Sequence, residues 1–600
     1  MKWYHQLWEL TKHVKGSYLI LLLVYPLLAL PQAVSGLVAK GVFDVLQGLE
    51  TISIFSGRLT MEVGSDLAGR IDSVFYLVGG LLVLHVVHVV PYFAGFYWFV
   101  RLHHLITSLL QKNMLMSIYR RPGAEGLPDS AGEAISRLRG DADEAAVFVF
   151  GTQNTISNLI VGSVALALLM HVDAWITSVV FFPLLIVVFT ARVASARVER
   201  YREASRKTTG DVTGAIGEVF GAVQAVQVAC AESRVIEHFR KFNERRRSAG
   251  LKDVLFNNLL GVFFGGVSTI ALGVVLLLVG TKLRSGELTA GDFALYQYYL
   301  IWIMGIPISI GGILVSIQQL KVSMNRMQVL TREDPPEQLV ARSPTYLWGE
   351  YPSLTYVEKQ PSHHLQQLDV VGLTSKFSDN DKGVEDVSFS LKRGSFTVIT
   401  GRVGAGKSTL LRAVLGLLPI DHGEVYWNGE LVVSPDAFFV PPRSAYVPQV
   451  PQLYSDSLRD NILIGIPEER VNLPEALRRA ALDEIEELLE DGLDTLVGPR
   501  GTRLSGGQIQ RAAAARMFVK DAELLVFDDL SSALDVKTEQ QLWQRIAEVD
   551  STCLVVSHRR AVLGAADQII VLSDGHVDGT GTLQELLESS EEMRRIWAED

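Results

Sequence analysis

The chain has 600 residues, of which 48% are hydrophobic and only 20% are charged, and its mean hydropathy is +0.23. This balance excludes a disordered polymer and is unusual for a purely soluble enzyme, so part of the chain is expected to lie in a membrane. A formal charge of −11 does not fit a dedicated nucleic-acid binder, and no nucleic-acid partner is expected. With only Cys230 and Cys553 present, a disulfide framework is excluded and no spacing suggests a zinc site.

The first half of the chain contains uncharged runs long enough to cross a bilayer, which takes about 20 helical residues at a rise of 1.5 Å each. The predicted spans are Ser17–Val38, Ser73–Val100, Ala145–Val172, Ala174–Ala191, Val254–Thr281 and Phe293–Leu320. Little more than Asp173 separates the third span from the fourth, which predicts a very tight turn. The fold class predicted for residues 1–330 is therefore an α-helical transmembrane domain with six spans.

Lysine and arginine are distributed unequally among the loops that join these spans. They are dense between the second and third spans and between the fourth and fifth, but sparse in the first and last loops. Because cytoplasmic loops are enriched in basic residues, both termini are predicted to be cytoplasmic, with the domain in the cell (inner) membrane and in contact with its lipid. The two basic loops read as helix, for example over Val219–Arg247, and could reach a cytoplasmic partner about 25 Å away. An alternative is that they are only solvated charged loops.

The second half of the chain has a different pattern. Residues 331–367 contain five prolines and predict a linker. After Leu368, short β-branched runs alternate with helical stretches, which is typical of a parallel α/β domain over residues 368–600. The clearest predicted strands are Ser395–Thr400 and Glu523–Phe527, and the clearest predicted helices are Lys407–Leu418 and Lys537–Val549.

A glycine-rich loop joins the first of these strands to the first of these helices. Its sequence from Gly401 to Ser408 is GRVGAGKS, which fits the phosphate-binding pattern GxxxxGK[ST] in the strand–loop–helix setting that this pattern requires. The glycines let backbone N–H groups and the helix N-terminus point at phosphates. The lysine supplies charge for the β and γ phosphates, and the serine supplies a hydroxyl for Mg²⁺. The predicted nucleotide-binding residues of this loop are Gly401, Gly404, Gly406, Lys407, Ser408 and Thr409.

The other strand ends in two carboxylates, Asp528 and Asp529. A carboxylate at the carboxyl end of a strand beside a phosphate loop is where Mg²⁺ is held, often through water. By itself an aspartate pair at a strand end indicates only a turn, but the phosphate loop makes Asp528 a candidate metal ligand.

Between the phosphate loop and this strand, and again after the strand, several short motifs resemble those of ATP-binding cassette (ABC) proteins. Leu504–Gln508 reads LSGGQ, which resembles the signature of that family. Tyr446–Gln449 resembles its Q-loop, Ser532–Asp535 its D-loop and Val556–His558 its H-loop, in the family's order and spacing. The membrane half also resembles the family at 132–138 and 321–330, so that the whole chain resembles an ABC exporter half-transporter.

The resemblance implies roles for residues at the matching positions. Phe377 would stack on adenine, Gln449 would sense Mg²⁺ and the attacking water, and His558 would hold the γ phosphate. Two cassettes pair head to tail in this family with ATP between them, so the signature and D-loop would act on the partner's nucleotide. The residues implied for that role are Ser505, Gly506, Gly507, Gln508 and Asp535. The implied partner is a second half-transporter, and the implied cofactors are ATP and Mg²⁺.

One departure from the family pattern lies at Asp529, where fully active relatives usually place glutamate as the base that orients water on the γ phosphate. Aspartate is one methylene shorter, and a misplacement of about 1 Å can lower a rate on the order of a hundredfold. We therefore expect a slow ATP site beside an intact signature, as in the degenerate-site subunit of a heterodimeric exporter. A second departure is Pro499, where exporters generally have glutamate; it has no predicted effect.

Two other functions stay open at this level. One is a homodimeric exporter that hydrolyses ATP through Asp529, and the other is an ATP-gated channel or regulatory membrane protein on the same scaffold. The spans carry few polar residues and no buried charge, which mildly favours an amphipathic or lipid-like cargo over a small ion. The substrate itself is not identified by the sequence. The polar residues inside the spans are His85, His88, Asn154, Asn158, Asn257, Asn258, Gln297 and Gln318.

Overall fold

The computed structural model describes residues 3–49, 51–54, 59–63, 67–121, 131–331, 334–353, 356–376, 382–485, 489–498, 501, 503–530, 534–548 and 551–599. The chain divides into two compact units. The first consists of Met1–Ile118 and Leu127–Gly349, and the second of Tyr119–Gly126 and Glu350–Asp600.

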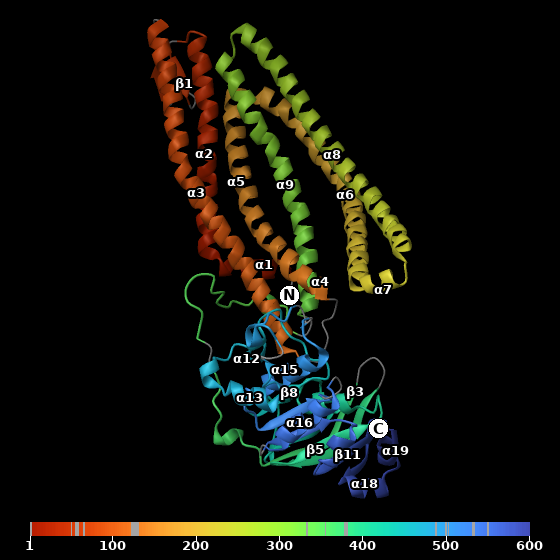
Figure 1. Ribbon diagram of the computed structural model, residues 1–600. Helices are drawn as coiled ribbons and strands as arrows, with labels where there is room; N and C mark the ends of the chain where they lie inside the picture. Colours follow the sequence, from red (N-terminus) through yellow and green to blue (C-terminus); the bar gives the residue numbers. More distant parts are fainter. Residues whose placement is uncertain are drawn as a thin grey trace. The chain divides into compact units, whose positions relative to one another are not determined.

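The first unit is built from long helices, which Figure 1 shows running side by side. Their bounds are α1 Trp3–His13, α2 Lys15–Leu46, α3 Leu67–Arg120, α4 Ala131–Ser136, α5 Ala142–Val172, α6 Ala174–Gly221, α7 Val223–Val228, α8 Glu232–Ser285 and α9 Ala290–Leu330. A π-helical turn, η1 (Arg137–Asp141), joins α4 to α5, and a short hairpin of β1 (Thr51–Ile54) and β2 (Leu59–Glu62) follows α2. Helix α9 packs against α5 and α2, and α6 packs against α8.

Four helices in the described part of the chain are long and apolar enough to cross a membrane. They cover Lys15–Leu46, Ala68–Arg120, Gly132–Val172 and Glu232–Ser285, and each contains one of the predicted spans. The predicted spans Ala174–Ala191 and Phe293–Leu320 lie inside the long helices α6 and α9, which are not among these four. A multi-span helical membrane domain is therefore present, whereas the number of six crossings stays a prediction.

The tight turn predicted at Asp173 is present and has a clear physical cause. Asp173 leaves the helical conformation between α5 and α6, and its carboxylate accepts hydrogen bonds from the backbone N–H groups of Trp175 and Ile176. This is an N-cap, which satisfies amide groups that the first turn of a helix leaves unpaired. The same carboxylate pairs with Lys282 of α8.

The continuous helix predicted over Val219–Arg247 is wrong. Helix α6 ends at Gly221, α7 is a short helix, and α8 begins at Glu232. Cys230 has a φ of +47°, a conformation that an L residue in a right-handed helix cannot adopt, so the helix must break there. No glycine or proline marks the turn at residues 229–231.

The second unit is the predicted α/β domain, and it contains two sheets. The larger sheet has the strand order β12-β11-β5-β10-β9-β8, with β11, β5, β10, β9 and β8 parallel and β12 antiparallel. The smaller sheet, β4-β3-β6-β7, is antiparallel and was not predicted. The strands are β3 Gln367–Lys376, β4 Gly383–Lys392, β5 Phe396–Gly401, β6 His422–Trp427, β7 Glu430–Leu431, β8 Ser444–Val447, β9 Leu524–Asp528, β10 Thr552–Val556, β11 Gln568–Ser573 and β12 His576–Gly581.

Helices of this unit pack against both of its sheets. Their bounds are α10 Lys407–Val414, α11 Pro435–Phe438, α12 Leu458–Leu463, α13 Leu473–Arg479, α15 Gly506–Phe518, α16 Val536–Ala547, α17 Arg560–Gly564, α18 Leu583–Ser589 and α19 Glu591–Glu599. Helices α10, α15, α18 and α19 pack against strands of the larger sheet, and α10 also packs against β3 and β4 of the smaller one. Helix α10 ends four residues earlier than predicted, because Gly416 has a φ of +71° and its backbone passes Asp436 too closely for a side chain.

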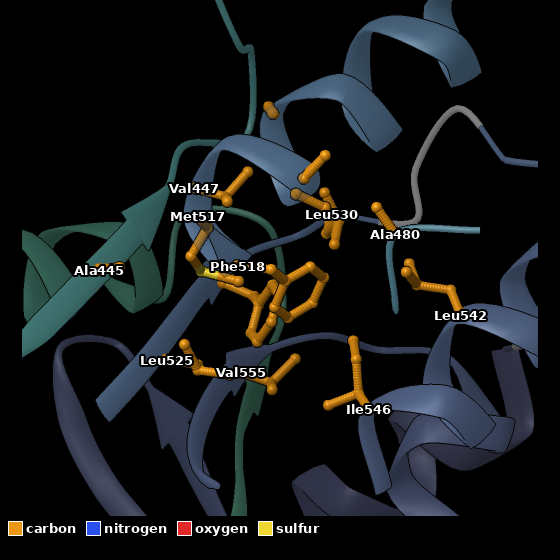
Figure 2. Close-up of a cluster of buried hydrophobic side chains, with 14 of the residues drawn as sticks. Ala445, Val447, Ala480, Met517, Phe518, Leu525, Leu530, Leu542, Ile546 and Val555 are labelled. Atoms are coloured by element: carbon orange, nitrogen blue, oxygen red, sulfur yellow. The ribbon is translucent and has the colours of Figure 1, made fainter. Parts of the chain in front are cut away.

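Hydrophobic side chains pack on both faces of the larger sheet. Along β9, Leu525 and Phe527 point to one face and Leu524 and Val526 to the other, as the two-residue period of a strand requires. Figure 2 shows the first of these clusters, in which side chains of α15 and α16 meet those of β8, β9 and β10. The parallel strands are therefore buried on both faces, which fixes their carboxyl ends in space.

Candidate nucleotide-binding site

The phosphate loop leaves the carboxyl end of β5, which lies between β10 and β11 in the larger sheet. Gly404 and Gly406 have φ angles of +89° and +97°, which side chains rarely tolerate. A Cβ atom on Gly406 would also lie 2.7 Å from the side chain of Val384. The loop therefore needs glycine at these positions in order to curl and to begin α10 at Lys407.

Lys407 is held inside this loop. Its Nζ donates hydrogen bonds to the carbonyl oxygens of Gly401 at 2.6 Å and Arg402 at 2.8 Å. Burial lowers the pKa of the Lys407 ammonium, and the nearby carboxylates of Asp529 and Asp528 oppose that shift. A phosphate oxygen is a stronger partner than a neutral carbonyl for this ammonium, so the loop is suited to bind an anion.

Asp528 ends β9 and is fully buried, at 0% exposure. The Ser408 hydroxyl donates a hydrogen bond to its Oδ1 at 2.8 Å, so the structure brings together two of the predicted Mg²⁺ ligands. The Tyr446 hydroxyl donates to its Oδ2 at 3.2 Å, and Arg412 Nη2 lies 3.7 Å from the same oxygen. Burial raises the pKa of the Asp528 carboxyl, and the contacts with Ser408, Arg412 and Tyr446 oppose the rise.

Tyr446 and Arg412 were not predicted as site residues, although the sequence carried a signal for Arg412. Arg412 lies one helical turn after Ser408, so both side chains fall on one face of α10. Tyr446 lies in strand β8, three residues before Gln449. Strand β8 pairs directly with β9, which ends at Asp528. Together with Ser408, the two groups place hydroxyls and a positive charge around the buried carboxylate of Asp528.

Asp529 follows directly and has an unusual conformation. Its φ is +53°, which aspartate tolerates better than most residues, and its backbone N–H donates to the carbonyl of Val556 at 3.1 Å. Gln449 Nε2 donates a hydrogen bond to Asp529 Oδ2 at 3.3 Å, and Asp529 Oδ1 is buried with no hydrogen-bond partner among the described residues. The predicted pair of Gln449 and Asp529 thus lies together beside the phosphate loop.

His558 is positioned by the central strand. It follows β10, which lies between β5 and β9, and its side chain is exposed. Because the carboxyl ends of parallel strands meet at one edge of a sheet, His558 reaches the same edge as Lys407 and Asp528. Thr409 is in the first turn of α10.

The signature segment forms the N-terminus of α15. Ser505 and Gln508 make a capping box, with Gln508 N–H donating to Ser505 Oγ at 3.2 Å and Ser505 N–H donating to Gln508 Oε1 at 2.8 Å. Ser505 and Gly506 are exposed, and Gly507 is half-buried. A capped and exposed helix N-terminus with two glycines is a suitable surface for an anion.

Asp535 is the N-cap of α16 and accepts a hydrogen bond from Thr538 N–H at 3.0 Å. The side-chain and backbone hydrogen bonds of Thr538 lower the pKa of the exposed Asp535 carboxyl. Phe377 and Pro499 lie outside the described residues.

The donors around Asp528 fit a magnesium ion. Mg²⁺ prefers oxygen ligands and is usually held by one or two protein groups together with substrate phosphates and water. Ser408, Asp528 and Gln449 supply such oxygens, whereas the described residues contain no cluster of three His, Cys, Asp or Glu side chains that would hold a metal without phosphates.

Comparison with known proteins gives matches over both units. The family described as "ABC transporter transmembrane region" matches residues 37–306, and the family described as "ABC transporter" matches residues 384–532. A protein of Staphylococcus aureus, whose provisional name is multidrug export ATP-binding/permease protein, is 27% identical over 471 residues, which cover 76% of this chain and 78% of that protein. A serine protease/ABC transporter B family protein of Dictyostelium discoideum is 26% identical over 92% of this chain but only 30% of its own length.

A solved structure is similar over nearly the whole chain. The structure of a bacterial Atm1-family ABC exporter with ATP bound has a TM-score of 0.77, shares 20% identity and covers 98% of each chain. At this identity the likeness concerns the fold, which extends through both the helical unit and the α/β unit.

Proposed function

Since the chain belongs to the ABC transporters, with the transmembrane region and the ATP-binding domain joined in one polypeptide, we propose that it exports a substrate by ATP-driven alternating access. One observation carries this proposal: the phosphate loop, the buried Asp528 and the Gln449–Asp529 pair lie at one edge of a sheet in a chain that also contains long apolar helices. Such an ATPase site serves transport because ATP binding and hydrolysis favour different conformations of the protein, so that nucleotide shifts their populations.

In this proposal ATP binds with Mg²⁺ at the phosphate loop. Lys407 contacts the β and γ phosphates, while Ser408 and Asp528 hold the ion, Asp528 directly or through water. Gln449 and His558 position the water and the γ phosphate, and Phe377 stacks on the base. The hydrogen bond between Ser408 and Asp528 supports this assignment, because it shows the two oxygens already adjacent.

The proposal also requires a second half-transporter. One chain supplies one phosphate loop and one signature, and the exposed N-terminus of α15 is suited to the γ phosphate of a nucleotide bound by the partner. Ser505, Gly506, Gly507 and Gln508 would act there, with Asp535 close to the contact between cassettes.

We further propose that this chain's own ATP site is slow and that its partner is a different polypeptide. Asp529 is one methylene shorter than glutamate, and one of its oxygens is buried without a partner among the described residues. The signature of the same chain is complete. A weak base beside an intact signature favours a heterodimer over a homodimer. In such a heterodimer this chain's signature completes the faster ATP site, which is the partner's.

The membrane part of the proposal has six crossings with both termini in the cytoplasm, and an amphipathic or lipid-like cargo. The distribution of basic residues supports the orientation, and the apolar exposed surfaces of α3 and α8 support contact with lipid. Asn158, one of the polar residues inside the spans, donates to the Ser309 hydroxyl at 3.1 Å and so joins α5 to α9.

Inverted membrane vesicles that contain the chain and its partner test the proposal. We expect a fluorescent amphipathic probe to accumulate inside them only when Mg²⁺ and ATP are supplied, and we expect Lys407→Ala to abolish accumulation without loss of the protein from the membrane. Ionic current that ATP switches on without any accumulation of probe would contradict export and favour a gated channel.

A further inference from the structure

The segment after α9 folds back along α3, and we call residues 339–348 the strap. It begins in the core of the first unit, where Leu339 and Val340 are buried. Asn113 Nδ2 of α3 donates hydrogen bonds to the carbonyls of Leu339 at 2.9 Å and Ala341 at 2.8 Å. The strap is therefore fixed at its start to the C-terminal half of α3.

From Asn113 the strap runs toward the N-terminal end of α3. Lys112 donates to the carbonyl of Pro344 at 2.5 Å and lies 5.4 Å from the ring centre of Tyr346. Further along, Trp348 contacts Arg101. The interval from Asn113 to Arg101 is about 18 Å of helix at 1.5 Å per residue, and an extended strap of seven residues spans about 23 Å, so the two lengths agree.

The far end of the strap makes a clamp around a cation. The guanidinium of Arg101 lies 5.1 Å from the ring centre of Trp98 and 5.1 Å from that of Trp348. Its Nε is buried without a hydrogen-bond partner, and in the described part of the chain no ion pair joins Arg101 to a carboxylate. Two indole rings hold the guanidinium in place through cation–π contacts but leave its hydrogen-bonding groups without an anionic acceptor.

This clamp lies where the lipid-facing surface of α3 ends. Large exposed hydrophobic side chains follow one another along α3 from Phe75 to Tyr97, and Arg101 is the first charged residue after them. Trp348, which contacts Arg101 at this point of α3, is 54% exposed. Tryptophan and tyrosine gather at the boundary between the hydrocarbon and the headgroups, where arginine and lysine also meet lipid phosphates.

Helix α1 adds aromatic and basic groups next to the strap. Gln6 Nε2 donates to the carbonyl of Pro336 at 3.3 Å, and Arg342 of the strap lies 3.9 Å from Glu9. Trp8 is 60% exposed, and Lys12 lies 5.8 Å from its ring centre. Among these side chains of α1 and the strap, Glu9 carries the carboxylate, and it forms ion pairs with Lys12 and Arg342.

We propose that Arg101, clamped by Trp98 and Trp348 and assisted by Lys112, binds the phosphate headgroup of an anionic lipid in the cytoplasmic leaflet. The strap is thus a lipid-binding element that lies outside the two family-matched regions, 37–306 and 384–532. An anionic lipid fits better than a zwitterionic one, because Arg101 and Lys112 bring two positive charges without a paired carboxylate among the described residues. The assignment of this site to the cytoplasmic leaflet rests on the proposed orientation of the chain. The preference for an anionic lipid does not depend on that orientation.

The test measures quenching of Trp348 fluorescence by brominated lipid in the reconstituted full-length chain. The difference between the wild type and Trp348→Phe isolates Trp348 among the nine tryptophans. Vesicles are an equimolar mixture of phosphatidylcholine and phosphatidylglycerol, with bromine on the acyl chains of one lipid or of the other. We expect stronger quenching when phosphatidylglycerol carries the bromine, and no effect of added inorganic phosphate.

Variants of Arg101 then test the charge. A basic residue near an anionic surface contributes on the order of 1 kcal/mol, so Arg101→Gln should lower the preference for phosphatidylglycerol about fivefold and Arg101→Lys should retain most of it. Trp597 is the matched control, because it makes a cation–π contact with Arg560 at 5.3 Å in the ATP-binding unit, and its own difference spectrum should show no quenching by either lipid.

Equal quenching by both lipids would overturn the anionic preference, and no quenching would overturn the placement of the strap at the membrane. Competition by inorganic phosphate would also overturn the proposal, because a free anion would then be the ligand. The measurement uses no nucleotide, so Lys407→Ala should leave it unchanged. Failure here is therefore distinguishable from failure of the proposed transport function.

Discussion

Replacement of Asp529 by glutamate should raise ATP turnover while it lowers stability. The added methylene extends the carboxylate by about 1.5 Å toward the γ phosphate, and correction of a misplacement of about 1 Å can be worth on the order of a hundredfold in rate. At 1.36 kcal/mol per decade, this is about 2.7 kcal/mol of barrier. Because residue 529 has a φ of +53°, which aspartate tolerates better than glutamate, the same change should cost about 1 kcal/mol of unfolding free energy.

The assay is steady-state phosphate release by the purified chain in lipid nanodiscs, alone and with its partner, together with thermal unfolding. Asp528→Glu is the matched control, since it makes the same chemical change one residue earlier. There the carboxylate is already fixed by Ser408 at 2.8 Å and by Tyr446, so the added methylene should abolish turnover. Brisk hydrolysis by the wild-type chain alone, unchanged in Asp529→Glu, would refute the slow-site reasoning.

Three further outcomes follow from the cassette. Tyr446→Phe removes a hydroxyl that donates to a buried carboxylate and should lower the unfolding free energy by about 1.5 kcal/mol, as chemical denaturation would show; an unchanged midpoint would mean that this bond contributes nothing. Ser505→Ala removes the cap of α15 and should reduce ATP turnover by the assembled pair. A filter-binding assay should show that this chain's own phosphate loop still binds nucleotide. Loss of that binding would contradict the action of Ser505 on the partner's site. A maleimide at pH 8 should label only the exposed Cys230, because burial raises the pKa of Cys553 to about 12, and mass spectrometry that finds two labels on the folded chain would disprove this.

The phosphate site could be anticipated because its geometry is local. The residues from Gly401 to Ser408 are contiguous, and their glycine spacing in a strand–loop–helix setting predicts a loop whose backbone N–H groups cradle phosphates. The pairing of Ser408 with Asp528 was predictable as well, because both follow strands of one parallel sheet. Tyr446 was harder to find, because its contact with Asp528 depends on β8 being the neighbour of β9, and strand order is not written in the sequence.

The membrane half was predictable in its helices but not in its details. Apolar length alone locates the helices, whereas the break at Cys230 has no glycine or proline to mark it. The strap also escaped prediction, because a segment with several prolines reads as a linker whatever it packs against. Its path depends on side-chain contacts such as Arg101 with Trp348, which connect residues far apart in the chain.

We propose that ATP is bound between two cassettes, one from this chain and one from a partner, and that the closure of the two cassettes moves the transmembrane helices. The most direct measurement is mass photometry of the chain purified from its native membrane in detergent, with Mg²⁺, ATP and vanadate added to trap the nucleotide. We expect particles with the mass of two half-transporters, and we expect Lys407→Ala to abolish these particles. Particles of one chain alone under trapping conditions, with no companion polypeptide, would contradict it.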